Sequence, residues 1–150
     1  MAASTDLQRD LGATIAHVVG QAVVARAAGC DIHLAVDLHS DGGHFEGECW
    51  VRHPDGELPE HAKRPLGVAG CLASLAFLRG SPDELDAAEL FDQLQAGEVH
   101  LSPADAQMAE GFTLADVAHA LDTLRARWPV VADEVVRMSP QILNNIATTH

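Results

Sequence analysis

The stretch ATIAHVVGQAVVARAAGC, residues 13–30, decides how this chain begins to fold. Thr5 and Gln8 form a capping-box pattern ahead of it, and Gly29 is a residue type that commonly ends a helix. Between these signals, apolar residues recur at the spacing of a helix face: Leu7, Leu11, Ile15, Val18, Val19, Ala22 and Val23. The sequence therefore predicts a long first helix with a buried face.

The segment after this helix predicts a β-hairpin. Apolar and polar residues alternate between positions 32 and 39, as in a half-buried strand. The turn sequence SDGG at 40–43 leads into HFEGECWVR at 44–52, which reads as a second strand. We expect a hairpin over about 32–52, packed beside the first helix.

The remaining chain predicts helices. Residues 61–79 are rich in Gly, Ala and Ser, which let a neighbouring helix approach closely, so we expect this helix at the centre of the domain. Ser81, Ser102 and Thr113 are N-cap residues of later helices. Pro129 should end or kink one helix, with a last helix over about 130–146. The predicted fold is mainly α (α+β), with one small β-hairpin, in a single domain over residues 1–150.

Composition restricts the partners. The formal net charge of −13 repels phosphate backbones and disfavours nucleic acid. The longest apolar run, residues 67–78, is shorter than the roughly 20 residues that span a bilayer, and no secretory signal is visible. Lys63, the single lysine, lies in no phosphate-binding loop, so we expect no ATP. We expect a cytoplasmic protein that binds an unknown protein partner or itself.

One helix window resembles a zinc-binding motif. In His-Glu-x-x-His metalloproteases, two histidines at i and i+4 bind zinc, and the glutamate activates the bound water. Here His17 stands at the first ligand position, Val18 at the base position and Gln21 at the second ligand position. Valine cannot take a proton, and a neutral amide is a poor zinc ligand.

The window and its surroundings resemble the protease domain of the FtsH-type ATP-dependent zinc metalloproteases, whose signature runs H-E-A-G-H-A-V-V-A. The match comprises His17, Gly20, Ala22, Val23, Val24 and Ala25. The hairpin sequence is similar to the one that follows that motif. AGCLAS at 69–74 is similar to an A-G-x-A-A-E phrase, with Ser74 in place of the acid. SPADAQMA at 102–109 is similar to the segment that holds the third ligand, which makes Asp105 the matching residue.

This resemblance implies an FtsH peptidase-like fold whose metal site is degenerate. His17 and Asp105 supply two ligands, fewer than the three of a catalytic zinc site. We therefore expect a non-catalytic relative, a pseudoenzyme without cofactor, that acts as a binding or regulatory module. One alternative is a metallopeptidase-like hydrolase with zinc held by His17, Asp105 and a replacement such as His44. A second alternative is a self-associating assembly domain.

In the absence of zinc, the vacated position must satisfy its own polar groups. We expect His17 to hydrogen-bond with Asp105 or Gln21, because buried polar groups without partners are costly. The alternative is that His17 points to solvent or packs in the core.

The hairpin carries a second candidate metal site. His33, Asp37 and His39 share one strand face, Asp41 lies in the turn, and His44 lies across it. Imidazole and carboxylate suit zinc or nickel, although a solvated polar face has the same composition. The cysteines Cys30, Cys49 and Cys71 form no CxxC pair and are expected to be buried thiols.

Overall fold

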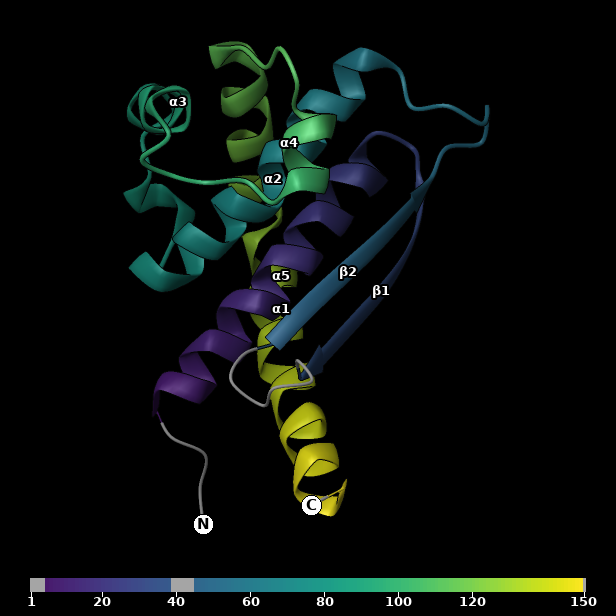
Figure 1. Ribbon diagram of the computed structural model, residues 1–150, viewed down its shortest axis with the longest axis vertical. Coiled ribbons are helices and arrows are strands. Elements are labelled where there is room, and N and C mark those ends of the chain that lie inside the picture. The colour runs from purple at the N-terminus through teal and green to yellow at the C-terminus, as the bar shows by residue number, and fades with distance from the viewer. Residues whose placement is uncertain (1–4, 39–44, 150) are drawn as a thin grey trace.

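The computed structural model describes residues 5–38 and 45–149. Over this part of the chain it is mainly helical with one small sheet, so the predicted fold class is confirmed (Figure 1). The elements, in order, are α1 (Thr5–Ala27), β1 (Asp31–Leu38), β2 (Phe45–Arg52), α2 (Glu60–Arg79), the 3-10 turn η1 (Pro82–Glu84), α3 (Ala87–Ala96), α4 (Pro103–Met108) and α5 (Leu114–Thr149).

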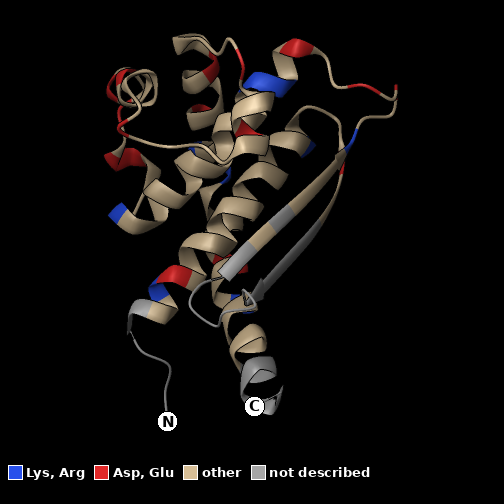
Figure 2. Ribbon diagram, viewed as in Figure 1, with Lys and Arg blue, Asp and Glu red and all other residues tan. Residues whose placement is uncertain are grey.

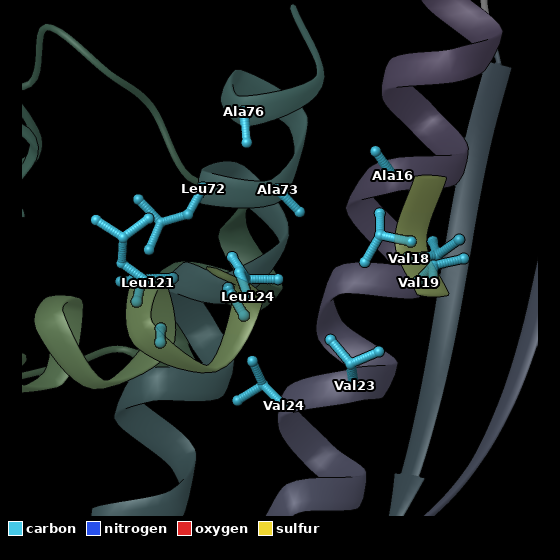
Figure 3. Packing of buried hydrophobic residues seen from close by; sticks show 14 of the residues in the cluster. Ala16, Val18, Val19, Val23, Val24, Leu72, Ala73, Ala76, Leu121 and Leu124 are labelled. Carbon is cyan, nitrogen blue, oxygen red and sulfur yellow. The ribbon is translucent and has the colours of Figure 1, made fainter. Parts of the chain in front are cut away.

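The helix α1 lies between the hairpin and the other helices. It contacts both strands, α2 and α5, and nearly every residue from 11 to 25 is buried (Figure 1). A helix with partners on several sides must be apolar almost all round, which explains its run of Val and Ala. Figure 3 shows these side chains meeting Leu72, Ala73, Leu121 and Leu124 from α2 and α5. The central place expected for the 61–79 helix is thus shared between α1 and α2.

The small residues of α2 allow the predicted close approach of helices. A Cβ atom built on Gly20 of α1 would lie 2.3 Å from the Cβ of Ala73 in α2. No side chain fits between the two helices at this point, and the glycine is what permits the contact.

The two strands pair antiparallel, in a register that runs from Asp31 opposite Arg52 to Leu38 opposite Phe45. Ile32, Cys49 and Val51 pack against the core, whereas His33 and Trp50 are exposed. At these positions the alternation of the sequence therefore corresponds to one buried and one exposed face of the hairpin, as predicted. The predicted turn at 40–43 lies outside the described residues.

No helix ends at Pro129, because α5 continues through Pro129 and Pro140 to Thr149. The part of the prediction that placed a helix end there is therefore wrong. A proline inside a helix costs a backbone hydrogen bond and about 3 kcal/mol or more. Buried residues lie on both sides of Pro129, namely Leu124 and Val131 with no exposed surface. Their packing against the rest of the core offsets the cost of the proline.

The predicted caps are present. The hydroxyl of Ser81 accepts a hydrogen bond from the Asp83 amide, and that of Ser102 accepts one from the Asp105 amide. Thr113 and Asp116 bond to each other's backbone amides, which starts α5. α1 already includes Thr5, and the residues before it lie outside the described part.

Candidate functional site

Three polar side chains that are far apart in the sequence meet between α1 and α4. The His17 Nε2 atom lies 3.2 Å from Oδ2 of Asp105, and the Gln21 amide donates to Oδ1 of the same carboxylate at 2.8 Å. His17 and Gln21 are four residues apart and therefore share one face of α1. We refer to this group as the His17–Gln21–Asp105 cluster. Both oxygens of its carboxylate have a partner.

The cluster is closed on one side and open on the other. Asp105 and Gln21 are buried, whereas the His17 side chain retains 30% of its exposure. A buried carboxylate requires partners, and these two residues supply them. The hydrogen bond expected for His17 is therefore present, and the alternative of an unpartnered His17 is wrong.

Two glycines of α2 make room for the cluster. A Cβ atom on Gly70 would lie 2.5 Å from His17 Nε2, so the imidazole ring lies directly against this glycine. A Cβ atom on Gly67 would lie 2.6 Å from the Ala109 nitrogen and 2.7 Å from the Asp105 carbonyl oxygen, so the α4 segment rests on α2 there. The sequence predicts that small residues of this helix allow a close approach, but it does not place these two glycines at the site. Their spacing of three residues in a helix was the available signal.

Val18 and Ser74, which stand where the FtsH-type signature has acids, serve in packing. Val18 is fully buried, and a Cβ atom on Gly47 of β2 would lie 2.5 Å from its Cγ1 atom. Ser74 donates from its hydroxyl to the carbonyl oxygen of Ala13, at 3.1 Å, and so links α2 to α1. Neither side chain can act as a general base.

A cleft of about 350 Å³ runs between β2 and α4 beside the cluster. It is within the size range of ligand pockets. We call it the β2–α4 cleft, and its walls combine apolar and polar side chains: His17, Gln21, Gly47, Cys49, Trp50, Val51, Leu66, Ser102, Ala104, Asp105 and Met108. His17 also borders two smaller cavities, of about 240 and 260 Å³.

The cysteines near the cluster are thiols rather than thiolates. Burial, with a smaller effect of the Asp105 charge, raises the pKa of Cys71 to about 11. Burial also raises the pKa of Cys49 to about 11, with Arg26 lowering it slightly and Asp105 raising it. Burial and Asp31 raise the pKa of Cys30. A nucleophilic cysteine needs the opposite shift, so these residues are poor nucleophiles.

The described residues of the cluster supply two candidate ligands for a zinc ion. Among the described residues, no three His, Cys, Asp or Glu side chains converge as metal ligands. His17 and Asp105 provide two ligands, and Gln21 directs its amide nitrogen at the carboxylate, which is one ligand short of a catalytic site.

The hairpin site stays a prediction. His33 is exposed and its ring lies 5.5 Å from that of Trp50, at 38°. His39, Asp41 and His44 lie outside the described residues, and so does the side chain of Asp37. For the same reason, the use of His44 as a replacement zinc ligand is untested.

A comparison with protein-family models finds no match to this chain, and a search of curated proteins finds none either. The FtsH-type resemblance therefore rests on the residues of this chain alone.

Proposed function

We propose that this protein is a non-catalytic relative of FtsH-type protease domains that binds an extended polypeptide segment in the β2–α4 cleft. The observation that carries the proposal is the self-satisfied His17–Gln21–Asp105 cluster. Its histidine and aspartate hydrogen-bond to each other and to a glutamine, at distances of 3.2 and 2.8 Å. Val18, at the position of the general base, is buried against β2 and has no group that could take a proton.

The cleft follows an edge of the sheet. Consecutive side chains of a strand point to opposite faces, yet Cys49, Trp50 and Val51 all border the cleft. A cavity touched by three consecutive residues runs along the strand's edge. Among the described residues, β2 pairs only with β1, so its other edge has backbone groups free for a further strand. Addition of a peptide strand to such an edge is a common mode of peptide recognition.

The walls of the cleft suit a peptide with apolar side chains, and the net charge of the chain favours one that also carries positive charge. Trp50 is 51% exposed and provides a large apolar surface, and Met108 and Leu66 also line the cleft. Across the whole chain, 22 acidic residues outnumber 9 lysines and arginines. Figure 2 shows acidic residues gathered around α3 and few basic ones on the same end of the molecule. This charge favours the approach of a neutral or basic segment.

Binding is tested with an eight-residue peptide of alternating valine and threonine that carries two lysines. Two N-methylated forms of this peptide are compared, each methylated on the amides of one edge only. Strand addition uses the amides of a single edge, so one methylated form should bind at least tenfold more weakly and the other as tightly as the parent. Equal affinities of both forms, or no binding of the parent, would refute the proposal.

Fluorescence of Trp50 reports the binding. The chain has two tryptophans, and in a Trp128→Phe background the signal comes from Trp50 at the cleft alone. Trp50→Phe provides the matched control, because its remaining tryptophan lies in α5 and should not respond to the peptide.

The absence of catalysis is tested separately. The tag-free protein should leave unfolded casein intact with or without added zinc. Chelator-sensitive cleavage that is lost in His17→Ala would favour the zinc hydrolase instead. Cleavage that survives His17→Ala would show that the active site lies elsewhere.

The same free edge supports self-association as a second candidate, since the β2 edges of two copies could pair with each other. The net charge of −13 opposes that contact. In sedimentation velocity, the fraction of dimer should then rise with salt concentration. A monomer at all salt concentrations would exclude this candidate.

A further inference from the structure

We propose that residues 98–112 form a flap beside the β2–α4 cleft and that Asp105 is the latch that holds it closed. The inference rests on the proposed function, because the flap would regulate access of the peptide to the same cleft. Its structural basis is the way in which α4 is attached to the rest of the protein.

The flap has little backbone support. Within the part of the chain that the structure describes, α2 is the only helix or strand whose backbone lies close to that of α4. The contact centres on Gly67, where the α4 segment approaches to within van der Waals distance. At the ends of the flap, Gly97 and Gly111 have φ of 75° and 78°, the left-handed conformation in which α3 ends and the turn before α5 is made.

Cavities surround the flap. The β2–α4 cleft of about 350 Å³ lies on one side of α4. A second cavity, of about 420 Å³, borders Ala106, Ala109 and Phe112 on another side. A third, of about 260 Å³, borders Leu101 and Ser102. The segment therefore has space beside it into which it can move, although Ala109 belongs to the core and Leu101, Met108 and Phe112 pack against it.

Among the described residues, the side chain of Asp105 makes the hydrogen bonds that join this segment to α1. Its two oxygens bind His17 and Gln21, one each, and it is buried although it lies between cavities. The bond from Ser102 to the Asp105 amide stays within the flap and adds no such link. Movement of α4 away from α1 must therefore break both bonds of Asp105. A peptide that enters the cleft next to His17 and Asp105 would compete with the same bonds.

The test is hydrogen exchange of the complete, unliganded chain, followed by mass spectrometry. Asp105→Ala should accelerate exchange of amides in 98–112 on the order of 10- to 100-fold, because two hydrogen bonds to a charged group are lost. Asp105→Asn should give an intermediate acceleration, since an amide can still form both bonds. Amides of α1, α2 and the hairpin should exchange at the wild-type rate.

His17→Asn is the second variant, and it keeps the test decisive if Asp105→Ala does not fold. The His17 side chain is partly exposed and makes only the 3.2 Å contact to Asp105. Its replacement should therefore accelerate exchange of amides in 98–112 by about three- to tenfold. Ser74→Ala is the matched control. It removes a hydrogen bond between α2 and α1 beside the same histidine, and this bond does not involve the flap, so exchange of the flap should not change.

Unchanged exchange of 98–112 in the Asp105 and His17 variants would overturn the latch. Equal acceleration in α1 and α2 would overturn it as well, because the variants would then loosen the whole domain. The peptide titration separates the two proposals. Faster flap exchange without peptide binding would support the latch and refute the proposed function. Peptide binding with unchanged flap exchange would support the proposed function and refute the latch. If both hold, Asp105→Ala should raise the association rate constant of the peptide.

Discussion

Replacement of the two site glycines of α2 by alanine should have different consequences, although Gly67 and Gly70 are three residues apart in one helix and both are buried. At Gly67 the new methyl group would meet backbone atoms, the Ala109 nitrogen at 2.6 Å and the Asp105 oxygen at 2.7 Å. At Gly70 it would meet the ring of His17, at 2.5 Å from Nε2. A ring can rotate about its side-chain torsions, whereas a helix backbone must move as a unit.

The magnitudes follow from these contacts. Overpacking typically costs 1–3 kcal/mol, and alanine in place of glycine inside a helix returns about 1 kcal/mol. The contacts at Gly67 are with backbone atoms, so the upper part of that range, about 2–3 kcal/mol, applies, and Gly67→Ala should lower the free energy of unfolding by about 1–2 kcal/mol. In Gly70→Ala, loss of the His17–Asp105 bond costs about 1 kcal/mol, which the helix propensity offsets, so the net change should be near zero. For a domain of this size, the midpoint of Gly67→Ala should fall by about 2–8 °C.

Urea denaturation measures the two free energies, and NMR spectra of the histidine ring identify the cause. Gly70→Ala should shift the ring resonances of His17 and leave the side-chain amide of Gln21 hydrogen-bonded to Asp105. Gly67→Ala should disturb the amides of α4 instead. If Gly70→Ala destabilises the protein as much as Gly67→Ala does, the ring is not the movable neighbour, and the description of the site is wrong.

Three other changes test the remaining features of the site. Val18→Glu should lower the free energy of unfolding by several kcal/mol, because it places a carboxylate in a fully buried position against β2; an unchanged denaturation midpoint would contradict the burial of Val18. Gln21→His places an imidazole where the amide now meets Asp105, so in equilibrium dialysis this variant should bind one zinc ion more tightly than wild type does. Equal zinc affinities would count against descent from a zinc site. The pKa values of Cys49 and Cys71 are raised to about 11, so about 0.1% of each is thiolate at pH 8, against about 10% for the ordinary value of 9.0. Iodoacetamide should therefore alkylate these two residues, followed individually by peptide mass spectrometry, roughly 100-fold more slowly in the folded than in the unfolded protein. The rate should rise as the pH approaches 11, and rapid labelling at pH 8 would show that the pKa values of these thiols are not raised.

Local patterns predicted most of the fold. The period of the first helix, the alternation of the strands and the caps at Ser81, Ser102 and Thr113 each depend on neighbours in sequence, and each has its expected place. The course of α5 through Pro129 could not be predicted in this way. A proline carries a local cost, and whether a helix tolerates it depends on the buried surface on either side, which only the tertiary structure supplies.

The candidate site, too, could be predicted from the sequence only in part. The spacing of His17 and Gln21 placed them on one helix face, and the resemblance to a zinc-protease segment directed attention to Asp105. The roles of Gly67, Gly70 and Trp50 come from contacts between segments that are distant in sequence. A glycine gives no sequence signal of the ring or backbone that will lie against it.

The packing of α1 against α5 has a consequence for synthesis of the chain on the ribosome. Leu124 lies against α1 at Gly20, about 100 positions earlier in the chain. At translation rates of about 5–20 residues per second, those positions take roughly 5–20 s to be made. During that time, the face of α1 that α5 will cover has no partner, and this newly made helix, apolar on nearly all sides, is a natural substrate for chaperones that hold nascent chains.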